Sequence, residues 1–97
     1  LSHVLEHMDI QEAVAVLSSY LPYVKNKAKV VVITPQEAGY RSDSTHRTFV
    51  DWSIAESILK KCSCSVIKTY SFPFPRTAGK LFRYNEFVTI GQYDKPK

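Results

Sequence analysis

Four side chains in two separate segments of this sequence could bind a metal ion or move a proton. His3, Glu6 and His7 lie close together near the start of the chain, and His46 lies in a long polar segment. His3 is three residues before Glu6 and four before His7, so all three share one helix face if a helix begins early. Imidazole and carboxylate groups are suitable ligands for Mn, Fe or Zn. His46 is also the best candidate for a general base, because its unperturbed pKa is near neutrality.

The polar segment that contains His46 runs from residue 36 to residue 47 and follows a predicted strand. Residues 30–34 read Val-Val-Val-Ile-Thr, a run of β-branched residues that Pro35 ends. The run is apolar on both faces, which indicates a buried strand rather than an edge strand. In open α/β sheets, ligands bind outside the carboxyl ends of the strands.

Several side chains of this segment could therefore line a substrate site. Tyr40, Arg41 and Asp43 precede His46 in the same segment. The alternative is a plain surface loop with no role in binding.

Two amphipathic helices are expected, one before and one after this strand. The first begins after Asp9, which with Glu12 forms a capping-box pattern, and it ends near Pro22. The second begins near Thr48 or Asp51 and ends in two lysines whose charge complements the helix dipole.

Further strands are predicted at residues 65–72 and 83–92, and residues 1–5 look like the end of an earlier strand. That strand end, the first helix and residues 30–34 would form most of a parallel βαβ unit with a right-handed crossover. No helix separates the last two strands, so they can pair antiparallel through residues 73–82. The pattern predicts one α/β domain with about three strands, two helices and a final antiparallel hairpin.

Composition sets limits on partners and compartment. The net charge of +4 allows anionic partners without requiring them. No apolar run is long enough to cross a membrane, and the features of a signal peptide are missing. Cys62 and Cys64 are too close for an unstrained disulfide and lack the usual spacing of a metal pair, so we expect reduced thiols in the cytoplasm.

The order of these elements, together with three motifs, resembles the C-terminal half of a class I S-adenosylmethionine-dependent methyltransferase. Residues 3–8, His-Val-Leu-Glu-His-Met, look like the segment after that family's fourth strand. Thr34-Pro35, followed after a loop by His-Arg-Thr-Phe at 46–49, resembles the end of the fifth strand and the entry to the next helix. The terminal hairpin is similar to the sixth and seventh strands, of which the seventh inserts antiparallel between the fifth and sixth. The resemblance covers essentially all 97 residues.

The resemblance implies a Rossmann-like sheet and S-adenosylmethionine as the methyl donor. A small molecule is our first candidate for the acceptor, with lipid, sugar, nucleic acid and protein as the alternatives. It implies the following roles: cofactor binding for Ser2 and His3, proton removal for His46, and substrate binding for Tyr40, Arg41 and Phe74. The family's Gly-rich loop lies in its N-terminal half, and this sequence contains no G-x-G. We therefore expect residues 1–97 to be a partial domain that is inactive alone.

The same histidines also resemble the metal site of the small-RNA 2′-O-methyltransferases, in which a Glu-x-x-Glu-His segment and a later His bind a divalent ion. Here the first position is His3 instead of Glu. Our expectation is therefore that no metal is used, with His3, Glu6, His7 and His46 as the set that would hold one.

A non-catalytic α/β module is the alternative from a different functional class. Such a module would self-associate, or would bind an anionic partner through Lys25, Lys27 and Lys29 and the Phe-Pro segment at 72–76. A strand followed by a G-x-G loop upstream of Leu1 would favour the enzyme instead.

An open strand edge at residues 1–5 predicts self-association, because an apolar edge can pair with another chain. We expect the protein to form a homodimer, or to stay associated with the missing half of the domain, in size-exclusion chromatography at high concentration. A clean, soluble monomer under the same conditions would contradict this expectation.

Overall fold

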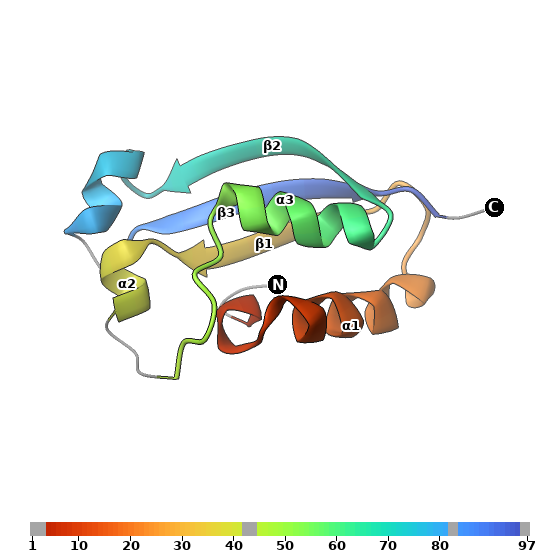
Figure 1. Ribbon diagram of the computed structural model, residues 1–97. Coiled ribbons are helices and arrows are strands. Elements are labelled where there is room, and N and C mark those ends of the chain that lie inside the picture. The colour runs from red at the N-terminus through yellow and green to blue at the C-terminus, as the bar shows by residue number, and fades with distance from the viewer. Residues whose placement is uncertain (1–3, 42–44, 82–83, 96–97) are drawn as a thin grey trace.

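The computed structural model describes residues 4–41, 45–81 and 84–95 (Figure 1). The regular elements of these ranges are α1 (Ile10–Tyr20), β1 (Lys29–Pro35), α2 (Glu37–Arg41), α3 (Trp52–Lys61), β2 (Cys64–Phe72) and β3 (Glu86–Tyr93). Three short 3₁₀ helices accompany them, η1 (Leu5–His7), η2 (Leu21–Tyr23) and η3 (Arg76–Lys80). These ranges form a small α/β domain with a three-stranded antiparallel sheet.

The last strand in the sequence, β3, is the central strand of the sheet, whose order is β1-β3-β2. It runs antiparallel to both neighbours, with Thr89 opposite Val32 of β1 and Thr69 of β2. β1 and β2 therefore run in the same direction and end at the same edge of the sheet, which we call the carboxyl edge. The predicted antiparallel hairpin of the last two strands is confirmed.

β3 begins at Glu86 and not at residue 83 as predicted. Asn85 precedes the strand because its side chain serves as a hub for the neighbouring loops. It donates hydrogen bonds to the side chains of Gln36 and Ser71 and to the carbonyl of Pro75, each at 3.0 Å.

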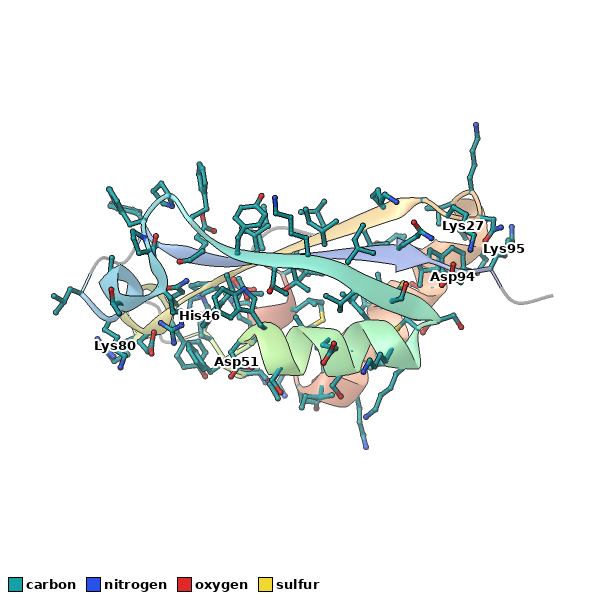
Figure 2. All side chains as sticks on the ribbon, turned by 90° about the horizontal axis from the view of Figure 1, so that it is seen from above. Lys27, His46, Asp51, Lys80, Asp94 and Lys95 are labelled. Carbon is teal, nitrogen blue, oxygen red and sulfur yellow. The ribbon has the colours of Figure 1, made fainter. Side chains whose placement is uncertain are left out.

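β1 forms where it was predicted, but its place in the sheet is different. Within the described ranges its one neighbouring strand is β3, so the prediction of an internal strand is wrong there. Val32 is 1% exposed on the side of the helices, whereas Val31 is 38% exposed on the opposite side. Apolar residues on both faces of a strand indicate burial on both faces, but α1 and α3 cover one face of this sheet (Figures 1 and 2).

Two further segments differ from the prediction. Residues 1–3 of the predicted first strand lie outside the described residues, and Leu5 belongs to η1 rather than to a strand. The predicted polar loop contains a third α-helix, α2, directly after β1. Its first turn holds Glu37 and its last turn Arg41, charges that complement the dipole of even a short helix.

Both long helices begin at the predicted capping residues. The side chain of Asp9 accepts a hydrogen bond from the Glu12 backbone N–H at 2.8 Å. Asp51, rather than Thr48, caps α3 by accepting from the Ile54 N–H at 2.9 Å. Each carboxylate satisfies an N–H that has no partner within its helix, which explains why the starts were predictable from sequence.

The core lies between the helices and the covered face of the sheet. Its buried side chains come from α1, α3, the strands and the segments that join them: Leu5, Ala13, Leu17, Leu21, Val32, Val50, Ala55, Ile58, Leu59, Cys62, Cys64 and Tyr93. None of the helices in the described ranges is long and apolar enough to span a bilayer.

Leu59 provides a test of this packing, because α3 buries it completely against the sheet. Leu59→Ala should lower the free energy of unfolding by about 2–5 kcal/mol through lost burial and the cavity left behind. Ile67→Ala is the matched control, since Ile67 of β2 is 52% exposed, and it should cost less than about 1 kcal/mol. Urea denaturation followed by circular dichroism measures both, and similar losses for the two variants would contradict the described packing.

Candidate functional site

The candidate site forms where the segment after α2 returns to η1. The carbonyl oxygen of Glu6 accepts backbone hydrogen bonds from Arg47 at 2.7 Å and from Thr48 at 3.0 Å. The hydroxyl of Thr48 donates to the carbonyl of Met8 at 2.5 Å. These bonds fasten residues 46–48 to the N-terminal segment and place His46 beside Glu6 and His7.

Glu6, His7 and His46 form one cluster, which we call the Glu-His cluster. Each contributes a nitrogen or carboxylate oxygen, and these atoms lie within 4.8 Å of one another. His46 Nε2 is 4.0 Å from Glu6 Oε2, and the two imidazole rings have centroids 4.7 Å apart. Glu6 is fully buried and the His46 side chain is 8% exposed. Glu6 and His46 are therefore largely removed from water, whereas His7 is partly exposed. Charges interact more strongly in such a buried position than at the surface.

The protonation pattern of His46 follows from its hydrogen bond. Its Nδ1 lies 2.8 Å from the carbonyl oxygen of Tyr40. A carbonyl can only accept, so Nδ1 carries the proton, and the lone pair of the neutral ring is on Nε2, the atom nearest Glu6. The Tyr40 ring also stacks on the imidazole at 5.2 Å with an interplanar angle of 21°. Tyr40 thus fixes both the tautomer and the plane of His46.

His7 is held in a similar way by the segment that contains His46. Its Nδ1 lies 3.0 Å from the hydroxyl of Thr45 and 3.4 Å from the Thr45 carbonyl oxygen. A hydroxyl can donate or accept, so these contacts are compatible with either tautomer of His7. Of the two histidines, His46 has its tautomer set by a carbonyl bond.

The structure brings together three members of the metal-ligand set named from the sequence. The fourth member, His3, lies outside the described residues, as do Ser2, which was assigned to the cofactor, and Asp43. Tyr40, assigned to substrate, contacts His46 directly. Neither the roles proposed for these residues nor the absence of a metal is tested by this geometry.

Arg41 and Phe74, the other two residues assigned to substrate, contact the loops of the carboxyl edge. Arg41 Nη2 donates to the carbonyl of Lys80 at 3.1 Å. Phe74 is 47% exposed in the connection after β2, and its backbone N–H donates to Asn85 Oδ1 at 2.7 Å. These bonds place Arg41 toward η3 rather than toward the Glu-His cluster.

A polar network that the sequence analysis missed supports the carboxyl edge. The amide of Gln36 donates to Ser71 Oγ at 2.7 Å and to the Glu86 carbonyl at 3.1 Å. Gly79 packs so closely on the Gln36 side chain that a Cβ at this position would overlap it. Gln and Asn in loops have no distinctive spacing, so residue types and spacing alone carried no signal for this network.

Arg76 has a structural role at the same edge of the sheet. Its guanidinium forms two parallel hydrogen bonds with the Glu37 carboxylate at 2.7 and 2.8 Å and lies 4.7 Å from the centroid of the Phe87 ring. Hydrogen bonding and charge from Arg76 hold the pKa of Glu37 below its usual range. The pair joins α2, which carries Tyr40, to the loop before β3.

The opposite end of the sheet carries a polar cavity of about 160 Å³, lined by Ser18, Leu21, Pro22, Lys61, Cys62, Ser63 and Tyr93. Cys62 and Cys64 are free, as predicted, and both are buried. Burial raises the pKa of the Cys64 thiol to about 11, so it remains protonated at neutral pH.

The lysines proposed for an anionic partner also lie at that opposite end (Figure 2). Lys27 pairs with Asp94 at 2.8 Å, and Lys29 donates to Gln92 Oε1 at 2.6 Å. The Phe-Pro segment follows β2 at the carboxyl edge, and the longest dimension of the domain is 44 Å. The two parts of that proposed surface are therefore not contiguous.

No protein-family model, curated protein or solved structure matches this chain.

The Arg76–Glu37 pair gives a prediction with a defined pH dependence. Because the pKa of Glu37 is lowered by folding, the stabilisation is present above its unfolded pKa of about 4.3 and is lost as the pH falls through the lower folded value. Glu37→Gln should therefore lower the free energy of unfolding by about 1 kcal/mol at pH 7, and by less at pH 3, which lies below the unfolded pKa.

Glu56→Gln is the matched control, because Glu56 forms an exposed pair with Lys60 on α3. Its effect at pH 7 should be smaller than that of Glu37→Gln. Urea denaturation at both pH values measures the difference, and a loss for Glu37→Gln that persists unchanged at pH 3 would contradict the assigned pair.

Proposed function

We propose that this chain is part of a methyltransferase that transfers the methyl group of S-adenosylmethionine to a small-molecule acceptor. The observation that carries the proposal is the sheet order β1-β3-β2, with the last strand antiparallel between the other two. This is the order that the motif resemblance implies for the end of the family's sheet. The free cysteines are in keeping with the cytoplasm as the proposed compartment.

We assign no part of the cofactor site to the described residues. Ser2 and His3 lie outside them, and the sequence has no G-x-G. S-adenosylmethionine would supply the methyl group when bound, and we assign no contact with it to these residues.

The Glu-His cluster is the part of this chain that we assign to the methyl acceptor. Methyl transfer to an oxygen or nitrogen requires positioning of the nucleophile and removal of one proton. Nε2 of His46 has the lone pair for that proton, and the buried carboxylate of Glu6 at 4.0 Å would stabilise the imidazolium that results. Tyr40 acts as a positioning residue through its carbonyl bond to Nδ1.

The non-catalytic module receives less support, because Lys25–Lys29 and the Phe-Pro segment lie at opposite ends of the sheet. Two separate weak contacts would then be needed to hold one partner. We keep this alternative as an outcome of the experiment that follows.

His46→Ala tests the proposed function in the complete gene product. The variant should lower methyl transfer by about 10²–10⁴-fold, the usual contribution of a positioned general base. The assay follows tritium from labelled S-adenosylmethionine into the small-molecule fraction of a cell extract. Lys95→Ala is the control, because Lys95 is exposed near Asp94 at the opposite end, and it should leave the rate unchanged (Figure 2).

Equal rates for the wild type and His46→Ala would remove His46 from the reaction. If the wild-type protein neither binds S-adenosylmethionine nor transfers its methyl group, the methyltransferase proposal is wrong and the non-catalytic module is favoured.

A further inference from the structure

We propose that the sheet face opposite α1 and α3 binds an amphipathic helix of a partner protein, with acidic residues beside the apolar stripe of that helix. Both long helices of the described residues pack on the other side of the strands (Figure 2). We call the uncovered side the open face. Its apolar side chains alternate with the core residues along the three strands: Val31, Ile33, Tyr70, Phe72, Val88 and Ile90.

The contacts of β3 show which of its side chains belong to the open face. Phe87 packs on the helix side, where the centroid of its ring is 5.6 Å from that of Phe49 and 5.3 Å from that of Trp52. Successive residues of a strand point to opposite faces of the sheet. Val88 and Ile90 therefore point away from the helices.

The register of the sheet joins these two residues to the outer strands. Val88 lies opposite Ile33 of β1 and Tyr70 of β2, so the three form one row across the open face. The next row consists of Val31, Ile90 and Lys68. The apolar side chains are thus contiguous across all three strands.

Large apolar side chains at both edges of the open face remain in contact with water. Val31 of β1 is 38% exposed, and Tyr70 and Phe72 of β2 are 37% and 58% exposed. Removing such surface from water is favourable, and a contiguous exposed apolar patch is a common mark of an interaction site. Aromatic side chains are also enriched at the centres of protein interfaces.

The dimensions of the open face suit a single helix. β3 has eight residues. At about 3.3 Å per residue the face is roughly 26 Å long, and its outer strands are about 10 Å apart. An α-helix is about 10 Å in diameter and rises about 1.5 Å per residue, so a helix of about 17 residues covers the face.

Two lysines make the open face positive near the start of β1. Lys29 Nζ donates to Gln92 Oε1 at 2.6 Å, and Lys68 Nζ lies 5.4 Å from the centroid of the Tyr70 ring. Neither lysine forms an ion pair with a carboxylate of the described residues. On the same side of β3, Oε2 of Glu86 is buried. Acidic residues on a partner helix would therefore match the exposed charge of this face.

A second copy of this chain matches the open face less well. The chain has a net charge of +4, and a second copy would bring two further lysines to the contact. Like charges brought together oppose association, whereas an acidic helix brings the opposite charge.

The open face and the Glu-His cluster lie on opposite sides of the sheet, because η1 packs Leu5 into the core beneath the helices. Helix binding therefore requires neither the cluster nor methyl transfer, and failure of either proposal leaves the other standing. The open face shares Lys29 and Phe72 with the surface considered for the non-catalytic module, but strand residues rather than loop residues form it.

Two synthetic helical peptides of about 18 residues test the open face in the complete protein. Both carry a leucine stripe at helical spacing, and the positions beside the stripe are glutamate in one peptide and lysine in the other. Fluorescence anisotropy measures the dissociation constant of each labelled peptide. We expect the glutamate peptide to bind at least about tenfold more tightly than the lysine peptide, and salt should reduce this difference.

Lys68→Glu should lower the affinity for the glutamate peptide about threefold to tenfold and raise the affinity for the lysine peptide. Lys61→Glu is the matched control, because it makes the same charge change at the end of α3, on the other side of the sheet. It should change either affinity by less than about twofold, because salt screens distant charges.

Tyr70→Ala with Phe72→Ala should weaken binding of the glutamate peptide at least about tenfold, because the pair removes the exposed aromatic anchors. Tyr20→Ala with Tyr23→Ala is the matched control, since it removes two exposed rings at the end of α1 and in η2 and should leave binding unchanged. Circular dichroism checks that both double variants are folded.

Three results would each overturn the inference: no binding of the glutamate peptide to the wild-type protein, equal affinities for the two peptides, or equal losses in Lys68→Glu and Lys61→Glu. Sedimentation equilibrium of the protein alone gives a separate check. A dimer that dissociates in the Tyr70→Ala, Phe72→Ala variant would show that a second copy covers the open face, which would also overturn the inference.

Discussion

The double hydrogen bond to the carbonyl oxygen of Glu6 is the constraint on which the site depends. Arg47 and Thr48 donate to this single oxygen, and they follow Glu6 by about forty residues in sequence. Together with the Thr48–Met8 and His7–Thr45 bonds, they join η1 to the segment after α2. With them, a buried carboxylate and two imidazoles occupy a common space. The bonds are donated by backbone N–H groups, so any residue except proline at positions 47 and 48 can form them.

The rest of the domain keeps the two sides of this junction in place. Asp9 caps α1 directly after η1, and Asp51 caps α3 shortly after the junction, so each helix fixes one of the joined segments. Both helices then bury apolar side chains against the same face of the sheet. The network around Gln36 and Asn85 and the Arg76–Glu37 pair secure α2, from which Tyr40 orients His46.

Structural features that depend on residues close in sequence could be predicted from the sequence. Features that depend on contacts between distant residues could not. The caps, the β-branched run of β1 and the final hairpin depend on residues close in sequence, and they appear where expected. The edge position of β1, the helix after it and the role of Asn85 depend on residues far apart in the chain. The members of the Glu-His cluster were identified by residue type and spacing. Their orientation was not, because a backbone carbonyl of Tyr40 sets it, and every residue type carries a carbonyl.

The central position of β3 has a consequence for how the protein forms during synthesis. The strand that joins β1 to β2 follows both of them in the sequence, so in a nascent chain that ends at residue 85 these two strands lack their common partner. Helices can form earlier because their bonds are local, whereas the sheet requires contacts across most of the chain. The nascent polypeptide therefore exposes apolar side chains of β1 and β2 until residues 86–93 have been made, and that interval is when these strands most need protection by a chaperone.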